Sequence, residues 1–350
     1  VPQVWRCRNQ DEAVVGASTV NGGSRMTDNV VNLAVIGCGN IVTSQHLPAI
    51  LQNSSVRLVA VCDADPMRAA TVREVSGCSY HTADYQRILA DDAVEAVLVC
   101  TPPWVTPAIT IDALHAGKDV LCEKPMATTV EEAERVAEAE RRSGRLLQVG
   151  FTYRHGPLMD ALRGWIREGR LGRPLQIRLS VFDEVWDPEG NPEHYERIMN
   201  TLRHGPPVLH DGAHAADHLA FLTGSNPVRV SACGLTGRPE FPAPNYNTAW
   251  IEFANGDQAK LEVGWFYPRF PKGEFQIVGP NGMAWLDREK GEAVLQSGTL
   301  TERVQLEEDR VRSCFREQLK KFAGCVRNRS TPVPGSKEGL ASLRLTLAIV

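Results

Sequence analysis

A lysine set between an apolar run and a proline is the residue of this chain best suited to chemistry on a hydroxyl group. Lys124 follows the apolar residues 120–122 and precedes Pro125. Apolar surroundings strip water from an ammonium group, which lowers its pKa and lets it share a proton with a reacting hydroxyl. The alternative is an ordinary solvated lysine that opens a helix, and the position directly after a strand-like run argues against it.

A second group of reactive side chains lies near residue 210. His210, His214 and His218 recur every four residues, with Asp211 and Asp217 between them. Residues four apart share one helix face, so the three imidazoles are predicted to converge. Imidazole serves as an acid, a base or a zinc ligand. Nothing else in the chain marks a metal fold, so we expect no metal, and we expect His218 to be a core residue.

A glycine turn follows the apolar run at residues 33–36. Its first glycine permits a tight turn, and its second lets the backbone approach a pyrophosphate at a helix N-terminus. Val42 stands where a third glycine is usual, so the motif departs from its common form while keeping the phosphate-binding pair. The alternative is a plain strand-to-helix turn. We predict a dinucleotide site formed by Gly37, Cys38, Gly39, Asn40 and Ile41.

Asp63 ends the next apolar run, residues 56–62, about 20 residues beyond the glycine turn. A carboxylate at this place can bond the 2′-hydroxyl of an adenosine ribose, and it would repel a 2′-phosphate. NAD is therefore favoured over NADP, although Arg68 lies close enough in sequence to compensate. The alternative is that Asp63 caps a helix predicted over residues 64–75.

These side chains need a scaffold whose strands end at one edge. Apolar runs at 33–36, 56–62, 94–100, 120–122 and 146–149 alternate with helical stretches, which predicts a parallel, doubly wound sheet. After residue 150 the runs alternate in polarity and are joined by Asn-Gly pairs at 255–256 and 281–282, which predict hairpins. The fold class is α/β: a Rossmann domain over residues 28–150, followed over 151–350 by an α+β domain with an open, mainly antiparallel sheet.

Composition limits the classes of protein that remain. A chain of 350 residues with 43% apolar and 23% charged residues suits two soluble domains, and a net charge of −4 gives no footprint for nucleic acid. No stretch is apolar enough to span a membrane. The nine cysteines are odd in number and show no C-x-x-C spacing, which indicates reduced thiols and a cytoplasmic protein. Residues 1–27 are predicted to form a tail outside the fold, with Met26 as the natural start.

Four stretches in order resemble the Gfo/Idh/MocA oxidoreductases. They are the glycine turn, Cys-Thr-Pro-Pro at 100–103, Gly-Lys-Asp-Val-Leu-Cys-Glu-Lys-Pro at 117–125 and Gly-Phe-Thr-Tyr-Arg at 150–154. The resemblance implies that Lys124 contacts substrate and cofactor near the nicotinamide and that Pro125 is cis. Thr106 stands where family members often have histidine. The remaining cofactor contacts that the resemblance implies are Thr101, Pro102 and Glu123.

The resemblance also sorts the residues around position 210. In that family an aspartate lies four residues before the catalytic histidine, a glycine two before it and a second aspartate three after it. His214, Gly212 and Asp217 fit this pattern, whereas His210 occupies the first aspartate position. The resemblance thus implies that His214 is the general base. We assign His210 to orienting the substrate and hold Asp211 as the reserve candidate.

Tyr153, Arg154 and the segment 182–186, which includes Trp186, carry aromatic and charged groups that could line a polar, sugar-sized pocket. Arg154 falls where the resembling enzymes keep a basic residue in the cleft. For Tyr153 and Trp186 the alternative is a packing role. In the resembling family a partner subunit covers the open sheet, which implies a homodimer or homotetramer.

The leading hypothesis is an NAD-dependent dehydrogenase that oxidises a ring hydroxyl of a sugar, inositol or related polyol. One alternative keeps the cofactor but returns the hydride in each cycle, giving elimination, glycoside cleavage or epimerisation through a keto intermediate. A second alternative is a non-catalytic NAD-binding sensor. The identity of the substrate and the oxidised carbon do not follow from the residues.

Overall fold

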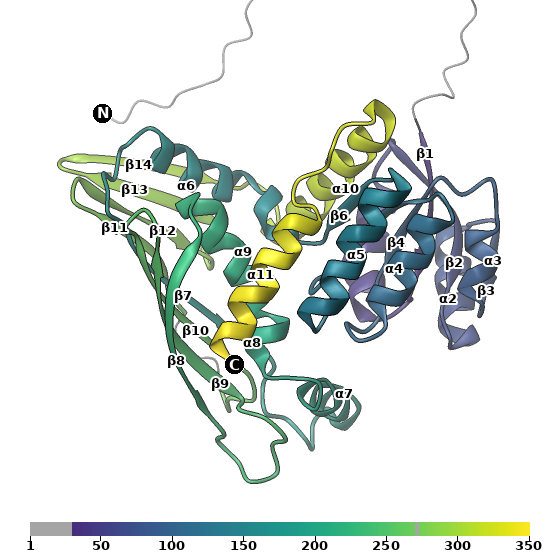
Figure 1. The fold of residues 1–350 in the computed structure, drawn as a ribbon, viewed down its shortest axis with the longest axis horizontal. Coiled ribbons are helices and arrows are strands. Elements are labelled where there is room, and N and C mark those ends of the chain that lie inside the picture. The colour runs from purple at the N-terminus through teal and green to yellow at the C-terminus, as the bar shows by residue number, and fades with distance from the viewer. Residues whose placement is uncertain (1–29, 270–272) are drawn as a thin grey trace, which may run out of the picture.

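The computed structural model describes residues 30–269 and 273–350, and the predicted tail over residues 1–27 lies outside this range. The first of two sheets has six parallel strands in the order β3-β2-β1-β4-β5-β6 (Figure 1). The parallel sheet and five of its strands were predicted, whereas β3 was not. The strand order reverses between β1 and β4, the place where open α/β sheets bind ligands beyond their carboxyl ends. The strands are β1 (Val31–Ile36), β2 (Val56–Cys62), β3 (Tyr80–Thr82), β4 (Ala96–Val99), β5 (Asp119–Cys122) and β6 (Leu147–Val149).

Helix α5 (Val130–Ser143) of this part is capped at both ends. The Thr129 hydroxyl accepts a hydrogen bond from the backbone N–H of Glu132 at 3.2 Å, and Gly144 ends the same helix in a left-handed conformation with φ of 64°. Such caps satisfy backbone groups that a helix end leaves unpaired. The elements are a short π-helical turn η1 (Val42–His46), α1 (Leu47–Leu51), α2 (Pro66–Ser76), α3 (Tyr85–Leu89), α4 (Thr106–His115) and α5 (Val130–Ser143).

The second sheet has eight strands in the order β14-β13-β12-β11-β7-β10-β9-β8. Only the β7–β10 pair is parallel, so the prediction of a mainly antiparallel sheet is confirmed. The Asn-Gly pairs join β9 to β10 and β11 to β12, as predicted. The strands are β7 (Gln176–Phe182), β8 (Pro227–Leu235), β9 (Tyr246–Phe253), β10 (Gln258–Gly264), β11 (Phe275–Gly279), β12 (Gly282–Asp287), β13 (Glu292–Ser297) and β14 (Leu300–Gln305).

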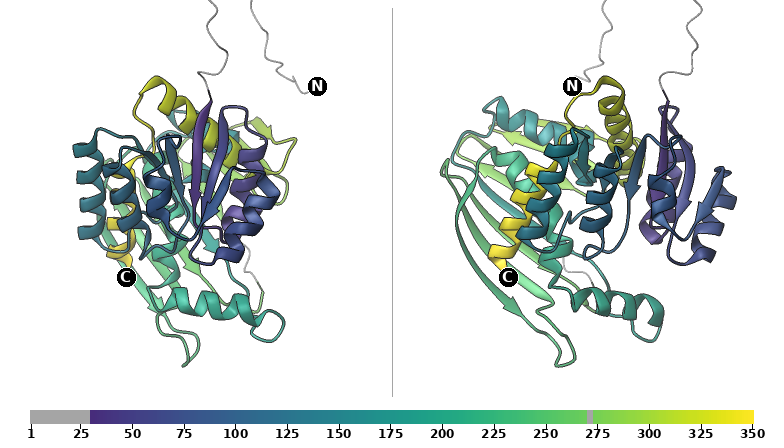
Figure 2. Two further views of the ribbon diagram at one scale, coloured as in Figure 1. Left: turned by 90° about the vertical axis from the view of Figure 1, so that its right-hand side faces the viewer. Right: turned by 45° about the vertical axis from the view of Figure 1, so that its right-hand side comes forward.

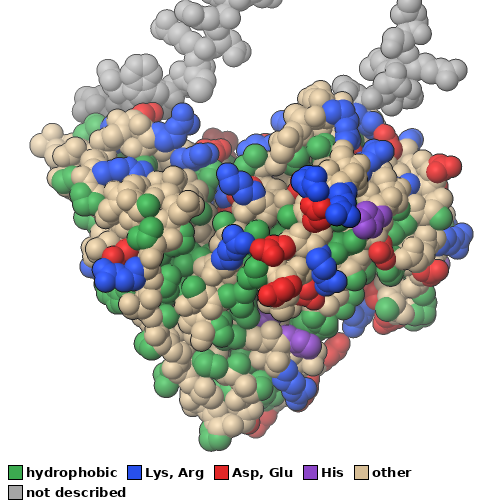
Figure 3. All heavy atoms as spheres, in the orientation of Figure 1, with side chains coloured by type: hydrophobic (Ala, Val, Ile, Leu, Met, Phe, Trp, Pro, Cys, Tyr) green, Lys and Arg blue, Asp and Glu red, His purple; other side chains and the backbone are tan. Residues whose placement is uncertain are grey.

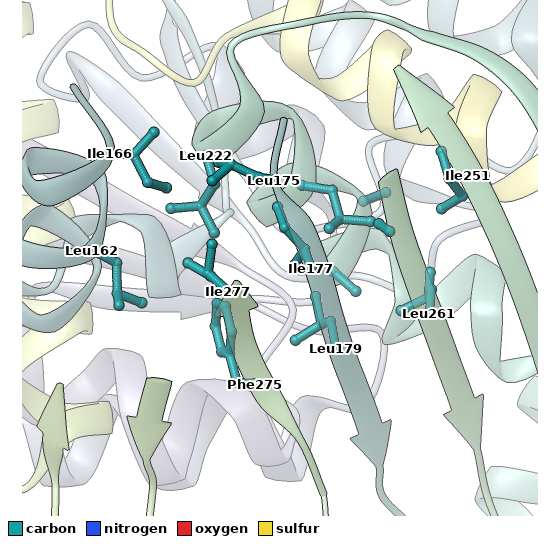
Figure 4. Close-up of a cluster of buried hydrophobic side chains, with 14 of the residues drawn as sticks. Leu162, Ile166, Leu175, Ile177, Leu179, Leu222, Ile251, Leu261, Phe275 and Ile277 are labelled. Carbon is teal, nitrogen blue, oxygen red and sulfur yellow. The ribbon is translucent and has the colours of Figure 1, made fainter. Parts of the chain in front are cut away.

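Helices cover one face of this sheet. Leu162 and Ile166 of α6 (Pro157–Arg167) and Leu222 of α9 (Gly212–Thr223) pack against strand residues such as Ile177 and Phe275 in one apolar core (Figure 4). Within the described residues no helix covers the other face (Figure 2). The remaining helical elements are η2 (Thr152–His155), α7 (Pro192–Leu202), α8 (Pro207–His210), α10 (Arg310–Asn328) and α11 (Ser336–Ile349).

The two C-terminal helices connect the sheets. Leu319 and Phe322 of α10 are buried in the same core as Val31 and Leu33 of β1. Helix α11 lies between α5 and α9, where the Ser342 hydroxyl donates to the backbone oxygen of Ala213 at 2.9 Å (Figure 1). Residues late in the sequence therefore complete the Rossmann part, and the domain boundary at residue 150 stays a prediction. Acidic and basic side chains are interspersed on the face shown in Figure 3.

Candidate active site

The glycine turn after β1 has the geometry that the sequence predicted. Gly37 adopts φ of +95°, and a Cβ there would lie 2.4 Å from the backbone oxygen of Cys100, so only glycine fits. A Cβ on Gly39 would meet no atom within 4 Å, which leaves room for a ligand at that backbone. Val42, the departure from the usual third glycine, is fully buried in the core beneath the turn. The turn can therefore receive a pyrophosphate, with Asn40 and Ile41 following on its exposed side.

Asp63 lies at the carboxyl end of β2, next to the glycine turn. Its carboxylate accepts hydrogen bonds from the backbone N–H of Cys38 at 2.7 Å and of Asp65 at 2.9 Å. Helix α2 is capped by Asp65, whose side chain accepts from the backbone N–H of Met67, so Asp63 is not the helix cap. Arg68 is exposed and its nearest acidic partner is Asp65 at 3.5 Å. Asp63 thus lies beside the glycine turn, and its contact with a ribose hydroxyl stays a prediction.

The segment after β4 is held by its own hydroxyl groups. The hydroxyls of Thr101 and Thr106 are 2.9 Å apart, and that of Thr106 also donates to the backbone oxygens of Thr101 and Pro102. Thr106 is buried and is the first residue of α4. It therefore fixes the turn at the carboxyl edge, in the position where family members often carry histidine.

Glu123 and Lys124 follow β5 and point to different partners. A Glu123 carboxylate oxygen lies 2.7 Å from Nε2 of the buried His46, the last residue of η1, and the other accepts from the backbone N–H of Lys124. Glu123 therefore ties the end of β5 to the helical segment that follows the glycine turn. The Lys124–Pro125 peptide is cis, as the resemblance implied.

Lys124 forms the central ion pair of the site. Its Nζ lies 2.9 Å from Oδ1 of Asp211 and 3.3 Å from the backbone oxygen of His210. Burial alone would lower the pKa of Lys124, but the Asp211 carboxylate outweighs it and the pKa is raised. The predicted lowering of this pKa is therefore wrong, because the acidic partner lies 87 residues further along the chain and no local pattern pairs it with Lys124. Lys124 is a charged hydrogen-bond donor here.

Asp211 is fixed from the other side by Trp265, whose Nε1 donates to Oδ2 at 2.7 Å. Burial would raise the pKa of Asp211, but Lys124 lowers it, so the carboxylate stays ionised. Asp211 separates α8 from α9, and this break in the helix aims its side chain at Lys124. The residue held in reserve by the sequence analysis is thus the one that contacts the lysine.

The three histidines have separate surroundings and do not form the single group that was predicted. His210 lies on α8, whereas His214 and His218 share α9 but contact different aromatic rings. His210 is buried and stacks on Trp265, with ring centroids 5.5 Å apart. His214 lies against Tyr153 at 4.7 Å, and His218 stacks on Phe275 at 5.8 Å.

Burial sets the charge state of all three. It lowers the pKa of His210 to about 4 and that of His218 to about 3. Burial, followed by the charge of Lys124, holds the pKa of His214 well below its ordinary value. Each ring is therefore neutral at pH 7, and His218 is the core residue that was predicted. Among the described residues no group of His, Cys, Asp and Glu side chains is arranged to hold a metal ion.

Arg154 and Asp217 form a buried ion pair with each other. Arg154 Nε lies 3.0 Å from Asp217 Oδ2, its Nη2 contacts the second oxygen, and its guanidinium lies over the ring of Phe221. Arg154 is 7% exposed and Asp217 2%. This pair supports the core between η2 and α9, so the structure does not bring Arg154 to a substrate.

Trp186 belongs to a compact aromatic cluster with Tyr195, Phe241 and Phe266, and Arg238 lies over its ring at 3.9 Å. The packing alternative is therefore the one that the structure supports for this residue. Tyr153, in contrast, contacts both His214 and the guanidinium of Arg310.

Several residues at the site escaped the sequence analysis. Trp265 directly follows β10, Arg288 directly follows β12 and Arg310 is the first residue of α10. All three lie more than 50 residues beyond Asp211 in the chain. The ring of Trp104, after β4, stacks on His204, after α7, at 3.7 Å and joins the two parts of the molecule. No short-range sequence pattern predicts such contacts. The one local signal was Arg310, an arginine at the start of a helix.

A parallel sheet that reverses its strand order at a glycine turn, with an acid-paired lysine at the same edge, defines a dinucleotide-dependent oxidoreductase. The comparisons agree. Residues 31–151 match an oxidoreductase family with an NAD-binding Rossmann fold, and residues 159–285 match the C-terminal domain of the same family. The chain belongs to the GFO/IDH/MocA oxidoreductase family, and its cofactor is NAD.

Named relatives include inositol dehydrogenases. The chain is 34% identical over 242 residues to inositol 2-dehydrogenase 2 of Saccharopolyspora erythraea, covering 67% of this chain and just under two thirds, 66%, of that protein. It is 26% identical to inositol 2-dehydrogenase of Rhizobium meliloti, covering 91% of this chain and 96% of that protein. A levoglucosan dehydrogenase structure with NADH and levoglucosan aligns with a TM-score of 0.81 at 21% identity, over 91% of this chain and 96% of that one.

Two further observations bear on the predictions from composition. Within residues 30–269 and 273–350, no helix combines the length and apolar character that crossing a membrane requires. The eight cysteines in the same ranges are all free.

Proposed function

We propose that this protein is an NAD-dependent dehydrogenase that oxidises a ring hydroxyl of a sugar, an inositol or a related polyol. The observation that carries the proposal is the Lys124–Asp211 pair at the carboxyl edge of the Rossmann sheet. His214 lies on the first turn of the helix that Asp211 opens. The inositol and sugar dehydrogenases among the relatives support the substrate class.

The charge states of the two side chains divide their roles. Lys124 is protonated because its pKa is raised, so it donates to the substrate oxygen and stabilises the negative charge that develops there. His214 is neutral at pH 7, so it can accept the hydroxyl proton as a general base. NAD, when bound, supplies the nicotinamide C4 that takes the hydride from the carbinol carbon. The proton goes to His214 and the substrate becomes a ketone.

The neighbouring residues hold this geometry. Trp265 fixes the Asp211 carboxylate, and that carboxylate fixes the Lys124 ammonium group. Gly37, Gly39 and Asp63 would hold the pyrophosphate and the adenosine ribose of NAD, and Lys124 lies at the same edge of the sheet. For the side chain of His210 a substrate-orienting role stays a prediction.

The test follows the hydride with myo-inositol deuterated at its ring carbons. A dehydrogenase accumulates reduced cofactor that carries one deuterium, measured by absorbance at 340 nm and by mass spectrometry. Transient oxidation with return of the hydride would leave the cofactor oxidised while the substrate changes. That result would replace the dehydrogenase proposal with the redox-neutral cycle. If the protein binds NAD tightly but neither reduces it nor changes any of several polyols, the non-catalytic NAD-binding sensor would be favoured.

We further propose that a second copy of the chain covers the outer face of the eight-stranded sheet. Residues of β9 alternate between the core and this face, with Trp250 49% exposed on it. An exposed tryptophan on a wide sheet face suits an interface between subunits. A homodimer or homotetramer would bury it.

A further inference from the structure

Two arginines beside the proposed substrate position have little or nothing in the protein to bind. The guanidinium carbon of Arg310 lies 4.9 Å from the ring centroid of Tyr153, and this ring lies 4.7 Å from that of His214. Arg310 donates no hydrogen bond to another described residue. Arg288 donates one, from Nη2 to the backbone oxygen of Ser180 at 3.3 Å. A guanidinium carries five N–H donors, so most of those on this pair are unused.

Carboxylates neutralise the other cations of the site but not these two. Lys124 pairs with Asp211 and Arg154 with Asp217. Farther along α10, Arg316 and Arg327 each pair with a glutamate. Within the described residues, neither Arg288 nor Arg310 has a carboxylate within 4.0 Å.

The positive charges of the two guanidinium groups oppose each other. The surrounding protein, and then the positive charge of Arg310, lower the pKa of Arg288. Tyr153 and Asp183 are the other groups that influence Arg288, and Asp183 in turn feels the charges of Asp211 and Lys124. Like charges are unfavourable near one another, and a ligand anion bound by both guanidinium groups would offset this repulsion.

These observations lead to a specific substrate class. We propose that the substrate carries an anionic oxygen group, a carboxylate or a phosphate, that Arg288 and Arg310 bind while the reacting hydroxyl lies at Lys124 and His214. Planar guanidinium groups recognise either anion through paired hydrogen bonds. The proposal rests on the dehydrogenase function above and narrows its substrate from neutral polyols to acidic sugars or sugar phosphates.

The test compares sugars that differ only at carbon 6, which carries a neutral hydroxyl, a carboxylate or a phosphate. NADH formation is measured with D-glucose, D-glucuronate and D-glucose 6-phosphate, and the binding of each to the NAD complex is measured by calorimetry. We expect one of the two anions to bind and react with a KM at least about 10-fold below that of glucose, since a hydrogen bond to a charged group contributes about 1.5–3 kcal/mol. The anion with the lower KM shows whether the site prefers a carboxylate or a phosphate.

Variants connect the preference to the arginines. Arg310→Leu and Arg288→Leu should each raise the KM for the preferred anion about 10- to 100-fold, with little change in kcat or in the KM for glucose. Arg310→Lys should recover part of the loss, because it restores the charge. Arg312→Leu is the matched control, an exposed arginine of the same helix, and should leave all constants unchanged.

Distinct results overturn the two proposals. If glucose reacts at least as well as both anions, or the arginine variants impair all three substrates equally, the anion site is wrong and the dehydrogenase stands. If an anion binds through the arginines but no NADH forms, the anion site stands and the dehydrogenase fails. Failure of both anions to bind the NAD complex overturns the anion site.

Discussion

Replacing Lys124 by methionine isolates the contribution of its charge, because methionine has a similar length and no ammonium group. Nζ lies 2.9 Å from the Asp211 carboxylate, with the two side chains 16% and 21% exposed. At an effective dielectric constant of about 20, this attraction is worth about 6 kcal/mol, and desolvation of both groups offsets most of it. Asp211 keeps its hydrogen bond from Trp265, so we expect a loss of about 2–4 kcal/mol in the free energy of unfolding.

The catalytic effect should be larger than the structural one. Loss of one donor to a developing oxyanion costs about 100- to 1,000-fold in kcat. Lys124→Met should therefore lose this much in steady-state NADH formation, while the Kd for NAD, measured by fluorescence quenching, changes less than about threefold. Lys124→Met/Asp211→Asn should regain part of the stability but none of the activity, since it removes the unpaired charge. A Lys124→Met enzyme with normal kcat would refute the assignment.

Other perturbations test separate parts of the structure. Burial depresses the pKa of His210 to about 4 and that of His155 and His218 to about 3, so the unfolded chain binds protons first as the pH falls below about 6.5. The free energy of unfolding should therefore fall between pH 6.5 and 4, by up to about 1.4 kcal/mol per pH unit for each histidine. A free energy of unfolding that does not change with pH in urea titrations would contradict the burial of these histidines. Asp63→Ala should lower the ratio of kcat/KM for NAD to that for NADP at least about 10-fold, because it removes both a ribose acceptor and a charge that repels phosphate; an unchanged ratio would mean that Asp63 serves only the turn. Trp250→Asp should shift sedimentation towards the monomer, and a wild-type chain that already sediments as a monomer would exclude the proposed interface.

The nucleotide-binding part was predictable because its signals are local. Five of the six strands contain short apolar runs, and Gly37 and Gly144 mark turns and caps through requirements of their own backbone. Strand β3 has the sequence Tyr-His-Thr and lacks such a run. Helices α10 and α11 were not foreseen as part of this scaffold. The apolar face of α10 packs into a core with residues some 300 positions earlier, such as Val31, and no local pattern encodes that contact. Helix α11 packs against α5 and α9, which are also distant in sequence.

The composition of the site was predicted better than its pairing. Lys124, His214 and Asp211 were all named, yet the pKa of Lys124 was expected to move the wrong way because its carboxylate partner lies 87 residues along the chain. Arg154 was expected to face the substrate, but Asp217, 63 residues away, holds it in the core. Such charged pairs form only when the folded chain brings distant residues together, so no local pattern predicts them.

The most direct test of the central claim is NADH formation at 340 nm with NAD and NADP in parallel. The panel contains sugars, inositols and polyols together with their acidic and phosphorylated forms. We expect the absorbance at 340 nm to rise steadily with NAD and at least one compound that carries a ring hydroxyl. This rise should be lost in the Lys124→Met variant. No reduced cofactor from any compound, in a protein shown to bind NAD tightly, would contradict the dehydrogenase function.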